Sequence, residues 1–209
     1  MAKKIAYYVL DTETTGLKEK YQEIVELSII RCSDRTQLSR VIRAQFPQNA
    51  SFDALRITGK TMEDLAYGIS QAELVHDINE FLSKDGLEPE SRCIVCHNTP
   101  FDRKFVHAHW DGVRDSFPAD LWLDTIPLSK RLFEMRGQDK PSMKLGNLVD
   151  RLGLKKYAAM HSAKIDTRAT YNLWKYLMDE RVPYVDLIKS HPHNKKETNE
   201  MVDDLMGEI

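Results

Sequence analysis

The sequence predicts an α/β fold in which helices flank one mixed five-stranded sheet, with three antiparallel strands followed by parallel ones. Three strand-like segments open the chain, strands and helices then alternate, and the helical segments carry apolar residues along one face. The 209 residues suffice for one packed domain and an appendage. We assign residues 1–182 to the domain and 183–209 to a C-terminal tail.

The strands are predicted from short apolar runs bounded by polar residues. The first run, Ile5 to Leu10, stops at acidic residues, and the runs 23–30 and 38–46 are separated by the polar stretch 31–37, which is typical of a hairpin. Two later runs, 92–97 and 121–125, each lead directly into a helical segment. A strand that alternates with helices in this way is typical of parallel pairing.

The helices are predicted from apolar spacing and from their first residues. Ser70 and Glu73 form a capping-box pattern ahead of residues that repeat at helical spacing, and Thr61 and Asp64 form a second one. Further helices are expected from Pro100, through Leu128 to Phe133, from Ser142, and from about Ser162 to Asp179.

Asp11 and Glu13 close the first strand and should project from the same face, because alternate residues of a strand do. Two like charges at that spacing repel each other, and the pKa of one should rise unless a cation lies between them. The alternative is a strand that simply runs out into a polar turn closed by Gly16. Acidic residues elsewhere in the chain distinguish the two interpretations.

Two helices carry an acid on their apolar face. Asp102 shares a stripe with Phe105 and Val106, and Asp166 heads the inward stripe of the helix 162–179. Asp102 could instead complete a capping box with Thr99. A carboxylate that faces a core is costly unless it is paired, hydrogen-bonded or bound to a metal.

Asp11, Glu13, Asp102 and Asp166 together carry four negative charges, which two divalent cations would balance. Ligands that are all oxygen favour Mg²⁺ or Mn²⁺ over Zn²⁺. Two such ions about 3.5–4 Å apart can clamp a phosphodiester for hydrolysis. His161 lies five residues before Asp166, and an imidazole with a pKa near 6.5 can take a proton from the attacking water.

At these positions the chain resembles the DnaQ-like (DEDDh) 3′→5′ exonucleases of the RNase H-like fold, in particular the proofreading epsilon-subunit type. The segments DTETTGL, HNTPFD and HSAKID resemble the three motifs of that family, in the family's order. The resemblance implies Asp11, Glu13, Asp102 and Asp166 as catalytic metal ligands, His161 as general base, and release of nucleoside 5′-monophosphates. It also implies that Thr15, Gly16 and Leu17, with Ile57, Thr58 and Gly59, bind the terminal nucleotides.

Three functions follow from these residues. The first is exonucleolytic digestion of single-stranded or frayed DNA 3′ ends, in replication proofreading or repair. The second is trimming of RNA or degradation of short oligoribonucleotides, although DTETTGL favours the DNA members because the small-RNA degraders typically carry a methionine there. The third is a non-catalytic module that binds strand ends or a polymerase, which would have no need of four mutually repelling carboxylates.

Composition limits the compartment and the partner. Cys32, Cys93 and Cys96 fit a reducing, cytoplasmic setting, and no apolar run is long enough to span a membrane. The spacing of Cys93 and Cys96 is that of a redox or zinc pair, but three residues apart in a strand they point to opposite faces, which favours buried structural cysteines. A net charge of −2 excludes a strongly basic surface but not an enzyme that grips only a strand end.

The tail turns polar from about residue 190 and then carries Met201, Val202, Leu205, Met206 and Ile209 at helical spacing. By analogy with proofreading exonucleases, residues 200–209 could form a helix on binding a DNA polymerase. The alternatives are a frayed terminus and a helix packed back on the domain.

Overall fold

The computed structural model describes residues 4–113, 115–155, 157 and 162–191. His161 and the segment 192–209, which includes the predicted partner-binding helix, lie outside the described residues.

The described strands form a single mixed sheet in the order β3-β2-β1-β4-β5-β6. The strands are β1 (Ala6–Thr14), β2 (Ile24–Arg31), β3 (Gln37–Val41), β4 (Arg92–Cys96), β5 (Leu121–Asp124) and β6 (Lys189–Ser190). β2 lies between β1 and β3 and is antiparallel to both, whereas β4 is parallel to β1 and β5 is parallel to β4. The predicted fold class is confirmed, but the predicted number of five strands is wrong. The sixth strand is two residues long and antiparallel to β5, too short to produce any alternation in the sequence.

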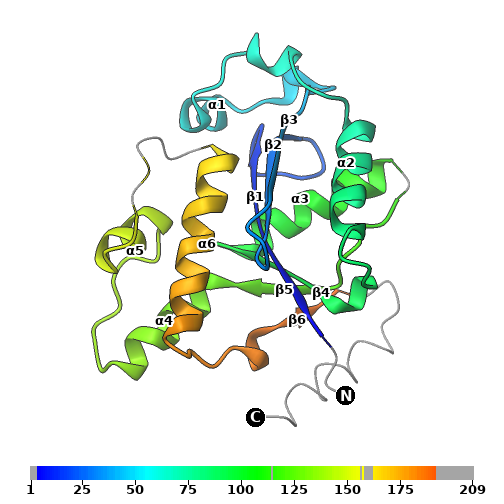
Figure 1. Cartoon of the computed structure of the whole chain (residues 1–209). Helices are drawn as coiled ribbons and strands as arrows, with labels where there is room; N and C mark the ends of the chain where they lie inside the picture. The colour runs from blue at the N-terminus through cyan, green and yellow to red at the C-terminus, as the bar shows by residue number, and fades with distance from the viewer. Residues whose placement is uncertain (1–3, 114, 156, 158–161, 192–209) are drawn as a thin grey trace.

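Helices cover both faces of the sheet (Figure 1). α2 (Gln71–Ser83) and α3 (Thr99–Gly112) pack on one face, and α4 (Thr125–Met135), α5 (Leu145–Arg151) and α6 (Ala163–Asp179) pack on the other. The short α1 (Phe52–Thr58) lies beyond the end of β1, on the connection between β3 and α2. α2 begins with the predicted capping box of Ser70 and Glu73, whereas α5 begins three residues later than the predicted Ser142.

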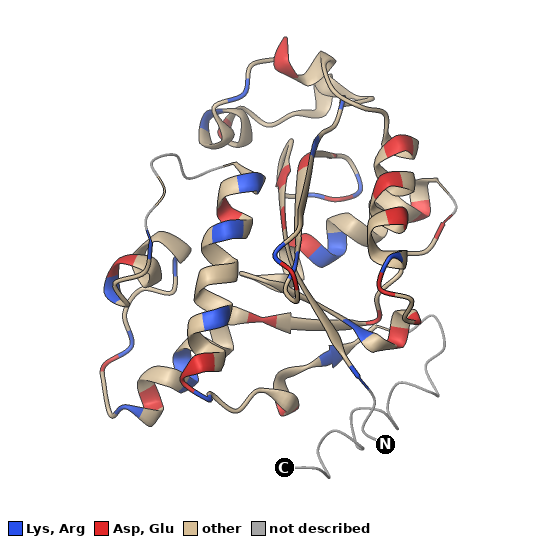
Figure 2. Cartoon of the chain, viewed as in Figure 1, with Lys and Arg blue, Asp and Glu red and all other residues tan. Residues whose placement is uncertain are grey.

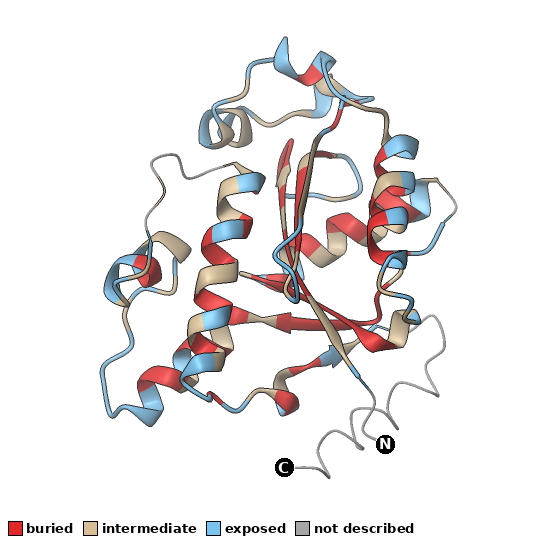
Figure 3. Ribbon diagram, in the orientation of Figure 1, coloured by how far each residue is buried: buried red, intermediate tan, exposed pale blue. Residues whose placement is uncertain are grey.

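Buried residues concentrate along the central strands and on the helix faces that meet them (Figure 3). Cys93 and Cys96 are fully buried in β4 and belong to the cores on opposite faces of the sheet. Both are free thiols, as is Cys32. The interpretation of Cys93 and Cys96 as structural cysteines is confirmed.

The chain returns to the sheet after α6. Val185 and Ile188 are buried, Ile188 in the core beneath α4 and α6, and both carboxylate oxygens of Asp186 accept hydrogen bonds from Arg131. These contacts place the short β6 beside β5. Acidic and basic residues are interspersed along the helices in Figure 2. Among the described residues, no helix has the length and apolar character that crossing a membrane requires.

Candidate active site

Three carboxylates converge at the end of the central strand. Asp11 and Glu13 lie two residues apart near the end of β1, and Asp166 comes from the first turn of α6, which packs against β1. One oxygen from each of these side chains lies within 4.8 Å of the others. Strand alternation therefore brings the first two together, as predicted, and the helix stripe adds the third.

Asp102 lies beside this group and is oriented by the same strand. Its Oδ1 accepts hydrogen bonds from the backbone N–H of Thr12 at 3.0 Å and from the Thr12 hydroxyl at 2.8 Å. The alternative of a capping box with Thr99 is wrong, because the hydroxyl of Thr99 donates to the carbonyl of Leu123 and α3 has no side-chain cap. Thr12 therefore fixes the orientation of the Asp102 carboxylate beside the cluster.

The start of α3 depends on a residue that the sequence did not single out. Asn98, the N-cap, adopts a left-handed conformation with φ of 73°. The two oxygens of Asp124 accept hydrogen bonds from the backbone N–H groups of Asn98 and Thr99, and Oδ1 also caps α4 through Ile126. Asp124 therefore fixes the helix turn that carries Asp102.

The protein itself makes this cluster unfavourable for negative charge. Burial, followed by the charges of Asp102 and Glu13, raises the pKa of Asp11 well above its ordinary value. Burial and the charge of Asp166 raise the pKa of Glu13 to about 8. Burial raises the pKa of Asp102 to about 7, although the hydrogen bonds from Thr12 lower it. An acid cluster of this kind suits divalent cations, whose charge would offset the repulsion.

Glu26 is a fifth carboxylate at the site, opposite Glu13 in the antiparallel ladder of β1 and β2. Its Oε2 accepts hydrogen bonds from the backbone N–H of Ala163 and from the Ser162 hydroxyl, at the start of α6. Its Oε1 pairs with Nζ of Lys60 at 2.5 Å, and both side chains are about one-sixth exposed. Glu26 therefore ties the helix that carries Asp166 to the loop that follows α1.

The segments expected to hold the terminal nucleotides meet at the same end of the sheet. The backbone N–H of Ser51, the N-cap of α1, donates to the carbonyl of Thr15, and α1 ends at Thr58 with Gly59 in a left-handed conformation. Leu17 is 72% exposed, and half of Ile57 is exposed. At Gly16, a Cβ would lie 2.1 Å from the side chain of Gln22, so this turn has no room for a larger residue unless Gln22 moves.

His97, in the second motif segment, is a structural residue. Its ring nitrogens lie 2.8 Å from the Thr125 hydroxyl and 2.7 Å from the Met143 carbonyl oxygen, and burial lowers its pKa. It holds the segment before α5 against the start of α4. His161, the predicted general base, lies outside the described residues.

A family model described as "Exonuclease" matches residues 8–174. Among curated proteins, the chain is 31% identical over 165 residues to a DNA polymerase III PolC-type of Thermotoga petrophila, covering 78% of this chain but only 11% of that protein. It is 27% identical over 171 residues to the DNA polymerase III subunit epsilon of Treponema pallidum, covering 81% of this chain and 75% of the subunit.

The fold is similar to that of solved nucleases. The nuclease domain of 3′hExo, described as a DEDDh family member bound to rAMP, superposes with a TM-score of 0.67. The sequences are 13% identical, and the match covers 86% of this chain and 95% of the nuclease domain. The mixed sheet and its flanking helices are therefore those of this group of folds.

Proposed function

This chain belongs to the exonuclease family whose model it matches, and on that premise we propose that it digests single-stranded or frayed DNA from the 3′ end. The reaction hydrolyses the terminal phosphodiester and releases a nucleoside 5′-monophosphate. The observation that carries the proposal is the convergence of Asp11, Glu13 and Asp166 within 4.8 Å at the end of β1. Carboxylates with raised pKa values at that point suit a metal-dependent hydrolase.

Asp11, Glu13, Asp102 and Asp166 would hold two Mg²⁺ or Mn²⁺ ions. When bound, such ions supply the activation of water and the stabilisation of the leaving oxygen. The protein's own contribution is to fix the four carboxylates. Thr12 orients Asp102, and Glu26 of β2 anchors the start of α6, the turn that carries Asp166.

His161 would act as the general base that accepts the proton of the attacking water. It precedes α6 by two residues, so its backbone is close in the chain to the turn that carries Asp166. Its unperturbed pKa near 6.5 suits proton transfer at neutral pH.

Thr15, Gly16 and Leu17, together with Ile57, Thr58 and Gly59, would bind the terminal nucleotides. The hydrogen bond from Ser51 to Thr15 supports this assignment because it ties the Thr15 turn to the start of α1, the helix that ends at Thr58 and Gly59. The exposed side chains of Leu17 and Ile57 offer apolar surface on which bases can pack.

DNA is the proposed substrate because curated relatives are named as DNA polymerase III components, which also favours a role in proofreading or repair. Because these relatives are named as parts of DNA polymerase III, a DNA polymerase is also the proposed partner, contacted through residues 200–209. The free cysteines support a reducing, cytoplasmic location. RNA is the second candidate substrate, since a solved structure of the same fold carries rAMP.

Digestion of labelled oligonucleotides tests the function. Single-stranded DNA, 3′-recessed duplex DNA and single-stranded RNA of one sequence are incubated with Mg²⁺, with Mn²⁺ or with EDTA. We expect 5′-mononucleotides from the 3′ end of the DNA with either metal and no digestion in EDTA. Digestion in EDTA contradicts the metal mechanism, and faster digestion of RNA than of DNA reverses the substrate preference.

A further inference from the structure

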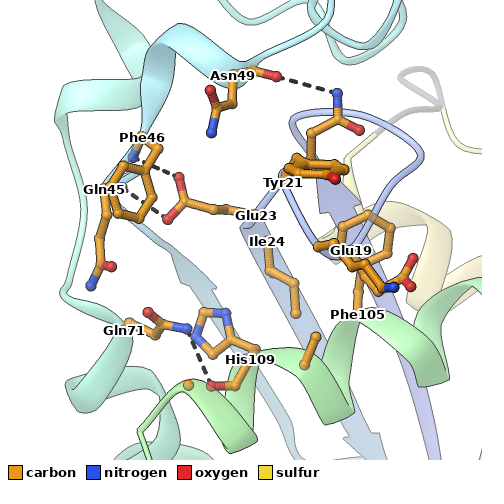
Figure 4. Close-up of a pocket in the computed structure, with 14 residues that line it drawn as sticks. Glu19, Tyr21, Glu23, Ile24, Gln45, Phe46, Asn49, Gln71, Phe105 and His109 are labelled. Atoms are coloured by element: carbon orange, nitrogen blue, oxygen red, sulfur yellow. Dashed lines mark hydrogen bonds between the residues drawn. The ribbon is translucent and has the colours of Figure 1, made fainter.

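A cavity lies on the α3 side of the loop that follows β1. It has a volume of about 390 Å³ and is lined by residues of the β1–β2 loop, the 45–49 segment, the start of α2 and the middle of α3. Figure 4 shows Phe46 and Tyr21 on different sides of the cavity, with His109 of α3 below them. None of these three residues belongs to the acid cluster.

His109 lines this cavity and carries a buried polar atom without a partner. Its side chain is 5% exposed, and its Nε2 has no hydrogen-bond partner among the described residues. Burial lowers the pKa of His109 to about 4, so the imidazole is neutral at physiological pH. A buried polar atom without a partner is costly, and a ligand that exchanges a hydrogen bond with it relieves that cost.

Two of the four exposed aromatic side chains among the described residues border the cavity, Tyr21 at 65% and Phe46 at 52% exposed. Their backbones are held in place. The N–H of Tyr21 donates to Lys18, and the N–H of Phe46 donates to the carboxylate of Glu23 at 2.8 Å. Exposed aromatic rings on a fixed backbone are suited to stacking with bases.

The charges around the cavity select a base over a phosphate. The lining includes the carboxylates of Glu19 and Glu23 and one ammonium group, Lys20. Because Glu19 is paired with Lys104, the acidic and basic groups balance and leave no excess positive charge for a phosphate, whereas a neutral heteroaromatic ring can stack on Tyr21 or Phe46. The side-chain amide of Gln71 and that of Gln45 add further polar groups for a base edge.

The cavity is close enough to the acid cluster for one strand to reach both. Phe105 and His109 follow Asp102 on α3 by three and seven residues, which is about 4.5 and 10.5 Å along the helix axis. A stacked nucleotide advances by about 3.4 Å. The cavity therefore lies within one to three nucleotides of Asp102. Lys104 fixes the intervening loop, since its Nζ donates to the Leu17 carbonyl at 2.6 Å and pairs with Glu19 at 3.3 Å.

We propose that this cavity binds one base of the digested strand, two to four nucleotides from its 3′ end, through Tyr21, Phe46 and His109. The proposal rests on the proposed function, because it requires a single strand whose end lies at the acid cluster. It adds a base-binding subsite beyond the segments that hold the terminal nucleotide.

An abasic scan tests the subsite. Eight-nucleotide DNA strands each carry one abasic position, from the second to the fifth nucleotide from the 3′ end, and the first cleavage is followed with Mg²⁺. For the wild type, we expect one position to raise KM at least about fivefold with kcat unchanged, since stacking of one base has an effect of this size. Phe46→Ala and Tyr21→Ala should raise KM on the intact strand and remove the sensitivity at that position.

Tyr67→Ala is the matched control, because Tyr67 is 63% exposed and does not line the cavity. It should keep the wild-type abasic profile. Thermal melting of all three variants checks that they fold, which is expected for exposed side chains. A flat abasic profile in an active wild type, or an unchanged profile in both cavity variants, overturns the subsite. No digestion of the intact strand by the wild type instead overturns the proposed function.

Discussion

Burial and the charges of neighbouring acids both oppose ionisation of the Asp11 carboxyl group. Asp11→Asn keeps the shape of the side chain and removes one charge from the cluster. We expect turnover to fall by more than about 10³-fold, because losing one metal ligand should remove several kcal/mol of transition-state stabilisation. The melting temperature of the metal-free protein at pH 8 should rise, because the repulsion with Glu13 and Asp166 is reduced.

Activity assays and thermal melting in EDTA measure the two effects of Asp11→Asn. Glu63→Ala is the control, since Glu63 is exposed and distant from the cluster in the sequence. A variant that retains a tenth of the wild-type rate would contradict the assignment of Asp11 as a metal ligand.

His161→Ala should separate proton transfer from metal binding. We expect the rate to fall by about 10²–10⁴-fold, the usual contribution of a general base. Mn²⁺ affinity, measured by calorimetry, should stay near wild type because the four carboxylates are unchanged. The acidic limb of the pH–rate profile should disappear, and its survival would identify another group as the base.

At the scale of elements, the pair of Glu26 and Lys60 connects β2, the loop after α1 and the start of α6. Lys60→Met leaves the charge of Glu26 without its partner in a mostly buried position. We expect a loss of about 1–3 kcal/mol in the free energy of unfolding, because the pair is neither fully buried nor freely solvated. We also expect a lower kcat, since α6 carries Asp166.

Lys84→Met provides the control for Lys60→Met. Lys84 pairs with Glu80 on the surface, where both side chains are more than half exposed, and its loss should change stability by less than about 0.5 kcal/mol. Urea unfolding measures both variants. If the two substitutions have equal effects on stability and kcat, Glu26 does not position α6.

The sequence predicts the parts of the site that follow local periodicity. Strand alternation indicates Asp11 and Glu13, and helix stripes indicate Asp102 and Asp166. Glu26 follows no such signal, because it lies inside a predicted strand and its partner Lys60 is 34 residues away. Asp124 was missed because its contact with α3 depends on how two strands align. The subsite at His109 likewise needs three segments that only the fold brings together.

At the scale of the whole molecule, the matching family model confirms the predicted recognition and the class of enzyme, an exonuclease, and the sheet confirms the fold class. The site residues stay predictions, as does the division at residue 182. Long-range pairing explains the one error in the sheet. β6 exists because buried Val185 and Ile188 bring Lys189 and Ser190 to β5.

The acid cluster should give the whole protein a metal-dependent pH profile of stability. The folded-state pKa values of Glu13, about 8, and Asp102, about 7, exceed the ordinary values of 4.5 and 3.8. The folded, metal-free protein therefore holds protons more tightly than the unfolded chain. This contribution to stability is complete below about pH 4 and is lost as the pH rises towards 8.

Thermal melting between pH 5 and 8, in EDTA and in Mg²⁺, measures this linkage. We expect the melting temperature in EDTA to fall as the pH rises, and Mg²⁺ to raise it more at pH 8 than at pH 5. Asp11→Asn should show a shallower fall. A melting temperature in EDTA that rises steadily from pH 5 to 8 would contradict the raised pKa values.

Two truncations distinguish the part of the C-terminal region that belongs to the domain. Deleting residues 192–209 keeps β6 and the hydrogen bond from the N–H of His191 to the Asp120 carbonyl, so activity and melting temperature should stay near wild type.

Deleting residues 183–209 also removes the buried side chains of Val185 and Ile188 and removes Asp186, which pairs with Arg131. Each buried aliphatic side chain contributes about 1.5–3 kcal/mol, and 1 kcal/mol corresponds to about 2–4 °C in a protein of this size. We therefore expect the longer deletion to lower the melting temperature by about 10 °C or more. Equal melting temperatures for the two truncated proteins would show that residues 183–191 contribute nothing to the stability of the domain.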